Sequence, residues 1–562
     1  MLRGQERDAL RRWLRRAALA ALALYAGWAF FDRATRIDPP DLTQPPPAPL
    51  TRDGATARVG DASLSSRGAL WVLQLAGEPR TLGYQRGRLE TPLMATGDQR
   101  MLDLFANMVP PRPLRALITA VVRARYRHLD DALPPDRRAE LFGESVGYAD
   151  RFAWFLPTYQ RLVYLHALYD IALAFEHSPL LACTAFVASG TATRDGHTIV
   201  GRNFDFDVDP WFDEDKVVEI VAPVGRIPFA SVSWPGMSGV VTGMNAEGIW
   251  VSVNGGRAGA PDPAGVPVVF TARAVLEEAR SLDEALAVIA RDAPMASHIL
   301  LLADGETGES AIVARAPNLP LGMIRSQRTT TLANHYRTAP HRDDPADARV
   351  RDTTSTLARE ARMRELVRAY GGRAAIDPRR AVAILRDRAG PGGTELPLGN
   401  RNALDALVAT HSVVADLTAR RLWVSEGPHT LGRYLQIDLA ARLARGVDAA
   451  EGERRGDIAA NPMRDDGTLA RYRHGARLRR EAAAHAAEGS DAAAATLLRR
   501  AIGLRDDDHR AWAALAALAE DAGDDEEAAR AWARVLALAP ESPLARREAE
   551  ERRTALVGST PR

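Results

Sequence analysis

The chain has 562 residues, of which 46% are hydrophobic and 26% charged, with 73 basic side chains against 72 acidic ones. At roughly 100 to 200 residues a domain, this length predicts two to four domains and at least one large core, which excludes a chain that is disordered throughout. The even charge balance argues against nucleic acid as a partner, and the single cysteine, Cys183, excludes an intrachain disulfide and a cysteine-based metal site. Taken alone, such a cysteine is most simply a small buried hydrophobe.

The N-terminus has the features of a membrane-targeting segment. An uncharged apolar run at 17–31 follows a cluster of arginines, and although it is short for the roughly 30 Å hydrocarbon core, Trp28 and the arginines extend its reach. The run ends in aromatic residues rather than in the small residues of a cleavage site, which favours an uncleaved transmembrane signal anchor over a removed peptide or an ordinary buried helix. The arginines predict that residues 1–16 stay in the cytoplasm and that the bulk of the chain lies on the periplasmic side of a bacterial inner membrane. Residues 32–62, which are rich in proline, are predicted to form an extended linker.

The next two regions differ in their predicted secondary structure. Residues 63–182 are predicted to be mainly helical, because apolar residues recur there at three- and four-residue spacing. Residues 183–445 instead contain short β-branched runs separated by turn signals. Helices are predicted at 112–133, 137–150, 162–175, 270–278 and 283–291, and strands at 198–200, 217–221, 249–253, 299–302, 310–313 and 421–424. Helices in runs and strands in runs indicate an α+β fold built of packed layers.

The C-terminal part changes composition again. A linker at 446–474 precedes a segment at 475–555 that is rich in alanine, leucine, arginine and glutamate. Gly489 matches Gly523 at a period of 34 residues, and Pro540 closes the second unit, which is typical of tetratricopeptide (TPR) repeats. Two units are fewer than usually stand alone, so we expect this tail to pack on the preceding domain or to bind a protein partner. A plain alanine-rich helical hairpin is the alternative interpretation.

Familiar catalytic and metal-binding motifs are missing from the sequence. There is no serine-hydrolase elbow, phosphate-binding loop or zinc-protease motif. The acidic alternation that begins at Asp205 fails as a calcium loop, because Pro210 and Lys216 stand where glycine and glutamate are needed. His335 and His411 have no recognisable partner, which favours structural roles for both. We therefore expect no metal and no cofactor.

The sequence around Cys183 carries the most specific motif of the chain. Cys183 opens Cys-Thr-Ala-Phe, and an Asp-Gly turn then leads to Gly-Arg-Asn-Phe-Asp at 201–205. Further motifs follow at 243–248, 253–255, 332–335, 410–414 and 422–424, and others precede it at 83–87 and 140–147. Together they resemble the N-terminal nucleophile (Ntn) hydrolases of the cysteine type, and more narrowly the acyl-coenzyme A:6-aminopenicillanic acid acyltransferase family, cysteine peptidase family C45. The resemblance covers approximately residues 70–439 and implies an αββα sandwich behind a helical propeptide region.

The resemblance also implies that the precursor cleaves itself between Ala182 and Cys183. A thiol with a reference pKa of about 8.5 is mostly protonated at neutral pH, whereas a freed α-amine titrates near about 7.7 to 8.0 and can act as the base within the same residue. The fungal acyltransferase has glycine before its nucleophile. Ala182 departs from that pattern but is small enough for an N-to-S acyl shift.

Five further residues match positions of the family's catalytic site: Arg202, Asp205, Asn254, Asn334 and Arg359. The resemblance implies that Arg202 and Asp205 flank the nucleophile and that the amide of Asn254 contributes to an oxyanion hole, where one fixed donor is worth ~3 kcal/mol. It implies a second polar site residue at Asn334, and Arg362 competes with Arg359 for the last position. A surface ion pair for the charged residues and a turn for either asparagine are the alternatives.

These observations predict a self-processing amidohydrolase or acyltransferase. Cys183 would attack the carbonyl of a small-molecule amide or thioester and pass the acyl group to water or to an amine. β-Lactams, N-acyl amino acids, peptides and lipid amides all stay open as substrates. The alternative is a catalytically idle, membrane-tethered scaffold that recruits partners through its TPR-like tail.

Overall fold

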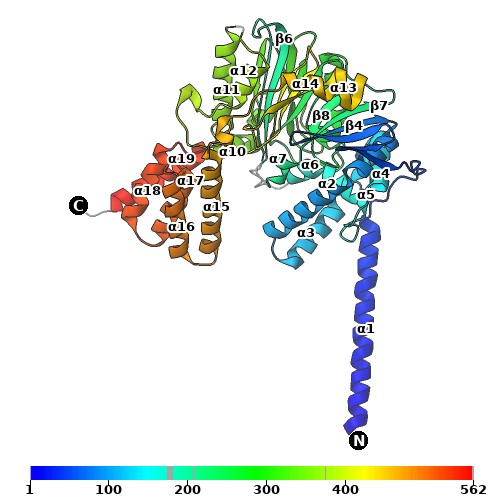
Figure 1. The fold of residues 1–562 in the computed structure, drawn as a ribbon. Coiled ribbons are helices and arrows are strands. Elements are labelled where there is room, and N and C mark those ends of the chain that lie inside the picture. The colour runs from blue at the N-terminus through cyan, green and yellow to red at the C-terminus, as the bar shows by residue number, and fades with distance from the viewer. Residues whose placement is uncertain (1, 174–180, 207–208, 374, 560–562) are drawn as a thin grey trace.

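The computed structural model describes residues 2–173, 181–206, 209–373 and 375–559. Within these residues the strands form two sheets (Figure 1). The larger sheet has eleven strands in the order β1 (Leu50–Asp53), β2 (Thr56–Val59), β3 (Ala62–Arg67), β4 (Leu70–Gly77), β7 (Val217–Pro223), β8 (Phe229–Ser233), β9 (Thr242–Asn245), β10 (Ile249–Gly255), β11 (His298–Asp304), β12 (Glu309–Arg315) and β13 (Gly322–Gln327). The smaller sheet has six in the order β14 (Thr329–Leu332), β5 (Leu181–Gly190), β6 (Gly196–Phe206), β15 (Ala409–Asp416), β16 (Arg421–Ser425) and β17 (Tyr434–Asp438).

Helices cover both sheets. The larger sheet packs against α2 (Pro79–Met108), α4 (Pro135–Gly147), α5 (Thr158–His166), α8 (Val268–Glu278) and α9 (Leu282–Arg291), and the smaller sheet packs against α11 (Thr356–Gly371) and α12 (Pro378–Leu385). Strand β5 contributes to hydrophobic cores on both faces of the smaller sheet, because successive side chains of a strand point to opposite faces of the sheet. On β5, Ala185 and Val187 contribute to the core shared by the two sheets, whereas Phe186 and Ala188 face α11 and α12. The protein is therefore a mixed α/β structure with large sheets and many helices.

The N-terminal part of the larger sheet differs from the sequence prediction. A linker was expected to residue 62 and helices after it, but β1 to β4 occupy this segment, and β4 pairs in parallel with β7. The turns between the first strands use Gly54 and Gly60, both at φ +56, a backbone conformation that glycine adopts without steric cost. Asp53-Gly54 is a hairpin signal, and the proline-rich composition on either side of residue 45 masked it.

The predicted strands from residue 198 onward all lie within observed strands, and the predicted helices at 270–278 and 283–291 lie within α8 and α9. The upstream helices have different ends. The helix predicted at 112–133 is shorter in the structure, where α3 spans Arg112–Arg125. The helix predicted at 162–175 is divided into α5 and α6 (Leu168–Leu173), and residues 174–175 lie outside the described part. The remaining α-helices between residues 181 and 467 of the described chain are α7 (Trp211–Glu214), α10 (Pro345–Thr353), α13 (Leu439–Arg445) and α14 (Ala450–Glu453).

Helices α2 and α4 approach each other through glycines. A Cβ atom added to Gly83 would lie 1.8 Å from the carbonyl oxygen of Glu140, and one added to Gly143 would lie 2.0 Å from that of Arg80. Neither distance is compatible with a side chain, so these positions require glycine for steric reasons. The close approach brings charged side chains of both helices into the core.

A buried charge cluster joins these helices to the sheet. It contains Arg86, Arg137, Glu140, Glu219 and Arg273, and all five are at least 93% buried. Glu140 lies at its centre, with Oε1 at 2.7 Å from Arg86 Nη1 and Oε2 at 2.8 Å from Arg273 Nη2. Burial alone would raise the pKa of Glu140, but the neighbouring guanidinium groups lower it to about 2. Glu140 is therefore ionised at physiological pH and balances the surrounding arginines.

Replacing Glu140 with glutamine should destabilise the protein by about 3 to 5 kcal/mol, because it removes a counter-charge that three buried arginines share. Glu526→Gln is the matched control: Glu526 pairs with Arg530 on the surface, where the two side chains are 83% and 66% exposed, and such a pair contributes at most about 1 kcal/mol. Urea unfolding of both variants measures the difference. Equal unfolding midpoints would show that the cluster does not carry this stability.

The first helix projects from the body. Helix α1 (Leu2–Thr35) extends away from the sheets (Figure 1), and its stretch Arg11–Thr35 is long and apolar enough to cross a membrane, with none of its most apolar window buried. Its C-terminal end contacts the body: Asp32 pairs with Arg123 at 2.5 Å, and Gln160 donates a hydrogen bond to the carbonyl of Thr35. A signal sequence passes the same length and composition test.

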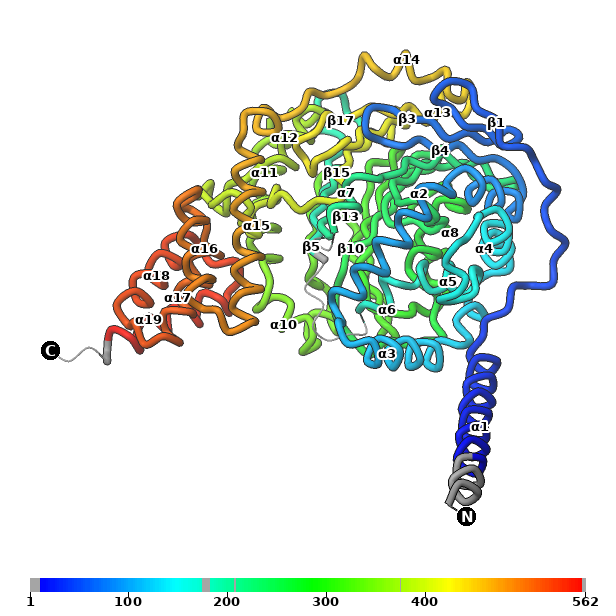
Figure 2. Tube along the Cα trace, turned by 60° about the horizontal axis from the view of Figure 1, so that its bottom comes forward, coloured from blue at the N-terminus to red at the C-terminus, as the bar shows by residue number. Residues whose placement is uncertain are grey.

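The C-terminal tail consists of helices that pack in sequence, α15 (Thr468–Ala487), α16 (Asp491–Leu504), α17 (His509–Asp521), α18 (Asp525–Ala537) and α19 (Pro543–Ser559) (Figure 2). The tail contacts the loop at 397–405 of the preceding domain. Asn400 Nδ2 donates to the carbonyl of Ala539 at 2.8 Å, and the backbone N–H of Arg401 donates to Glu541 at 2.7 Å. On α10, Asp352 forms a bidentate ion pair with Arg547 of α19.

Candidate active site

Cys183 is the third residue of β5 and is fully buried. It pairs with Phe204 of the neighbouring strand β6, and Ala182 pairs with Asp205. The scissile bond expected from the sequence, Ala182–Cys183, therefore lies inside the sheet beside two of the motif residues. The strand pairing explains why Cys183 and the Gly-Arg-Asn-Phe-Asp motif occur at a fixed spacing: the hairpin of β5 and β6 places them opposite each other.

Two side chains hold the backbone of Cys183. The backbone N–H of Cys183 donates to Asn334 Oδ1 at 2.7 Å, and Arg359 Nη1 donates to the Cys183 carbonyl at 2.8 Å. Arg359 Nη2 also donates to Asn334 Oδ1, at 2.9 Å. We call this arrangement of Asn334 and Arg359 around Cys183 the backbone clamp. It comes from three separate parts of the chain: β5, the segment after β14, and α11.

Arg202 lies on the side of the sulfur atom. Its Nη2 is 4.0 Å from Cys183 Sγ, and the guanidinium donates to the carbonyls of Val241 and Val253 and to the hydroxyl of Thr242. Burial raises the pKa of the Cys183 thiol, and the positive charge of Arg202 opposes this effect. Neutral carbonyl groups thus hold the guanidinium in place, and its positive charge is not paired with a carboxylate by these bonds, so that it can stabilise the thiolate of Cys183.

Asp205, on the neighbouring strand β6, influences the pKa values of Cys183 and Arg359. Its carboxylate is 2% exposed and raises the pKa of Cys183, while its backbone N–H hydrogen-bonds the thiol and lowers it. Burial also lowers the pKa of Arg359, and the negative charge of Asp205 partly offsets this. Asp205 therefore lies within electrostatic range of both the thiol and the backbone clamp.

Asn254 is placed beside the clamp by reciprocal hydrogen bonds. Asn254 Nδ2 donates to the carbonyl of Ala333 at 3.0 Å, and Asn334 Nδ2 donates to the carbonyl of Gly255 at 3.0 Å. Asn254 Oδ1 is buried and has no hydrogen-bond partner among the described residues. One of the two N–H groups of Asn254 Nδ2 is used by Ala333, which leaves the second as a candidate donor to an oxyanion.

The structure distinguishes the two arginines that competed for the last site position. Arg359 is 1% exposed and contacts Cys183 and Asn334 directly. Arg362 instead forms a bidentate pair with Asp387, with Nε to Oδ1 at 2.8 Å and Nη2 to Oδ2 at 2.9 Å. Four of the predicted residues, Arg202, Asn334, Arg359 and Asp205, thus surround Cys183, and Asn254 adjoins them.

Other residues near the thiol had no predicted role. Tyr169 of α6 has a buried hydroxyl without a hydrogen-bond partner in the described chain, and burial together with the charge of Cys183 raises its pKa. His411 accepts or donates a hydrogen bond to Thr242 at 2.8 Å and stacks on Phe204 with ring centroids 4.9 Å apart. Burial lowers the pKa of His411 well below its usual range, which keeps it neutral. His411 belongs to the family-like motif at 410–414, whereas no sequence motif marks Tyr169.

The chain is similar in sequence to one known protein family and to one curated protein. A family model described as acyl-coenzyme A:6-aminopenicillanic acid acyl-transferase matches residues 191–427, a segment that begins after Cys183 and contains the other predicted site residues. An uncharacterized protein of Archaeoglobus fulgidus is 24% identical over 253 residues, which are 42% of this chain and 42% of that protein. The chain thus spans less than half the length of this curated relative. The family match supports an amidohydrolase or acyltransferase.

Solved structures with partial similarity include two hydrolases. The Caenorhabditis elegans ortholog of N-acylethanolamine-hydrolyzing acid amidase has a TM-score of 0.32 and 19% identity, covering 42% of this chain and 93% of its own. A mutant of the conjugated bile acid hydrolase from Clostridium perfringens has a TM-score of 0.28 and 11% identity, covering 43% of this chain and 88% of its own.

Proposed function

We propose that this protein is a self-processing Ntn hydrolase, an αββα sandwich enzyme that cleaves or transfers an acyl group through Cys183. The observation that carries the proposal is the backbone clamp, in which Asn334 and Arg359 hold the nitrogen and the carbonyl of Cys183 itself. An ordinary catalytic cysteine needs its sulfur positioned. A residue whose own amine is the base needs its backbone nitrogen positioned as well.

Cleavage of the Ala182–Cys183 bond converts an amide nitrogen into a basic amine. In the intact chain the nitrogen lone pair is delocalised into the peptide bond, so it cannot accept a proton from the thiol. The freed amine titrates near about 7.7 to 8.0 and can take that proton at neutral pH. Asn334 Oδ1, which accepts the N–H in the intact chain, would keep the amine beside the sulfur.

The proposed reaction has two halves. The sulfur attacks the substrate carbonyl, the bond to the leaving amine or thiol breaks, and the Cys183 ammonium returns its proton to the leaving group. Water or an amine then attacks the resulting thioester and gives its proton to the Cys183 amine as the sulfur leaves. Arg202 stabilises the thiolate, and the second N–H of the Asn254 amide donates to the oxyanion. Asp205 balances the charges of both arginines.

Intact-mass measurement of the purified protein tests the self-processing part. We expect two fragments, one ending at Ala182 and one beginning with Cys183. Because Cys183 itself would initiate the cut, no added protease should be required. A single uncut chain that turns over an N-acyl amide would overturn self-processing and leave the hydrolase part intact.

One observation favours the alternative of a catalytically idle scaffold: the thiol is fully buried in the intact chain, and burial raises its pKa. An idle thiol should stay unreactive after purification, whereas a nucleophile freed by cleavage should be alkylated readily. Because the chain has a single cysteine, any label reports on Cys183 alone. Absence of labelling in cleaved protein would favour the scaffold, and its binding surface would then be the TPR-like tail.

We also propose that α1 anchors the protein in the bacterial inner membrane, with the body on the periplasmic side. Removing residues 2–29 should release the protein into the soluble fraction, because the exposed apolar window of α1 is lost. The cut preserves Asp32, whose pair with Arg123 ties the end of α1 to the body. The full-length protein, washed with high salt, is the control. A truncated protein that still sediments with membranes would contradict anchoring by α1.

A further inference from the structure

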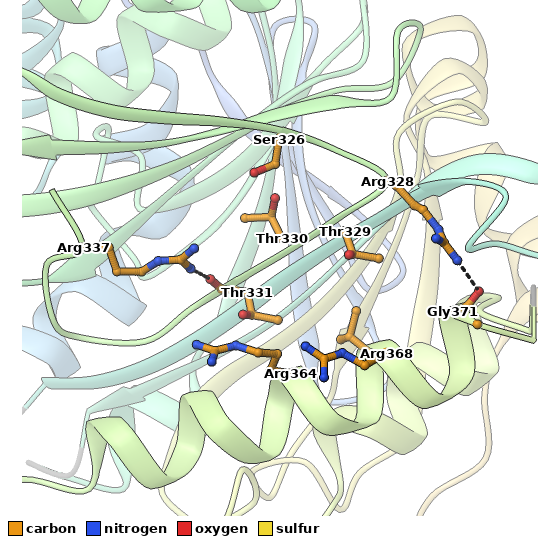
Figure 3. A pocket seen from close by; sticks show the side chains of 11 residues that line it. Ser326, Arg328, Thr329, Thr330, Thr331, Arg337, Arg364, Arg368 and Gly371 are labelled. Atoms are coloured by element: carbon orange, nitrogen blue, oxygen red, sulfur yellow. Dashed lines mark hydrogen bonds between the residues drawn. The ribbon is translucent and has the colours of Figure 1, made fainter.

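A polar cavity of about 390 Å³ lies between the edge strand β14, the end of β13 and helix α11 (Figure 3). Its described lining includes the arginines Arg328, Arg337, Arg364 and Arg368, together with hydroxyl side chains at 326 and 329–331. Arg364 and Arg368 rise from the same side of α11 toward β14, and Arg337 reaches in from the segment after β14.

The cavity holds more positive charge than its carboxylate balances. Glu360 accepts Arg364 Nη2 at 2.6 Å and Arg337 Nη1 at 3.3 Å, and it also contacts His335. Arg328 donates at 3.5 Å to the carbonyl of Gly371, which is neutral. Arg368 forms no ion pair within the part of the chain that the structure describes. Glu360 therefore pairs with two of the four guanidinium groups, while Arg328 donates to a neutral carbonyl.

The spacing of two of these arginines on α11 adds mutual repulsion between them. Arg364 and Arg368 are four residues apart on one helix, a spacing at which like charges repel and destabilise the helix. A bound anion would convert this repulsion into attraction. The planar guanidinium fork matches phosphate oxygens, and threonine and serine hydroxyls add neutral donors. The volume is within the range of small-molecule sites.

We propose that this cavity binds a phosphate- or pyrophosphate-bearing small molecule from solution. The cavity is separate from the candidate active site, because none of the residues placed around Cys183 lines it. Helix α11, which forms one wall of the cavity, lies on the side of the body away from α1 in both views (Figures 1 and 2). This position favours a soluble ligand over a lipid headgroup of the membrane that α1 would enter. The proposal does not depend on catalysis at Cys183.

Isothermal titration of the full-length protein in detergent with inorganic pyrophosphate tests the proposal. We expect saturable binding with one site per chain, and about tenfold weaker binding in each of Arg364→Gln and Arg368→Gln, because each loses a charge-assisted hydrogen bond. Arg379→Gln, an exposed arginine on the neighbouring helix α12 that does not line the cavity, is the matched control and should bind as the parent does. Unchanged circular dichroism verifies that the variants fold.

Two further arms identify the ligand class. Sulfate at matched ionic strength should bind more weakly than pyrophosphate, and vesicles of phosphatidylcholine with phosphatidic acid should not be captured through this cavity. The proposal is overturned by absence of pyrophosphate binding, by equal affinity of the Arg364 and Arg368 variants and the parent, or by binding of the vesicles in place of the soluble anion.

Discussion

Replacing Cys183 with alanine should leave the protein as one uncut chain and abolish turnover of any acyl substrate. The thiol is the nucleophile in both proposed reactions. In the first it takes the acyl group of Ala182 in an N-to-S shift, and water then hydrolyses the thioester and cuts the chain; in the second it attacks the substrate. Because the chain has one cysteine, no other thiol can substitute. Intact mass reports the first reaction, and release of amine from an N-acyl amide reports the second.

The fold should survive this substitution. Cys183 Sγ contributes a weak interaction with Arg202 at 4.0 Å, and its backbone hydrogen bonds to Asn334 and Arg359 do not involve the side chain. Thr184→Val on the same strand is the matched control, because the buried hydroxyl of Thr184 makes no hydrogen bond in the described structure. We expect that variant to be cut and active. A cut Cys183→Ala chain would show that an external protease acts there.

The sequence predicted the residues of the site better than their contacts. Cys183 and Asn334 are 151 positions apart, and no periodicity links them, so only the motif resemblance brought them together before the structure. The exchange of side-chain hydrogen bonds between Asn254 and Asn334 depends on how β10 meets the segment after β14. Contacts of this kind are set by tertiary packing, which a single sequence does not encode locally.

The strands β1 to β4 and the site neighbour Tyr169 escaped prediction for different physical reasons. Strands β1 to β4 are short, and their turn glycines stand beside a proline-rich stretch that dominates the local composition. The aromatic ring of Tyr169 on α6 fits a helical apolar pattern, so nothing in its neighbourhood marks the hydroxyl as a neighbour of Cys183. The later strands were predicted because each is a β-branched run bounded by turns.

Replacing Arg202 with methionine should move the titration of Cys183 to higher pH. Burial already raises the pKa of this thiol, and the positive charge of Arg202 lowers it, so removing the charge leaves the raising effects of burial and Asp205 less opposed. At a given pH the variant therefore holds less thiolate than the parent, and its turnover should fall. Ultraviolet absorbance of the thiolate measures this titration directly, since Cys183 is the sole cysteine.

Stability provides an independent readout of the same substitution. Methionine removes the donors to the buried carbonyls of Val241 and Val253, and each acceptor left unpaired costs about 1 to 3 kcal/mol. Arg202→Lys should recover part of both effects, because it restores the charge but cannot reach all acceptors at once. The pH profile of Arg202→Lys should thus lie between those of the parent and Arg202→Met. If all three proteins titrate alike, Arg202 supports the packing of the strands without acting on the thiol.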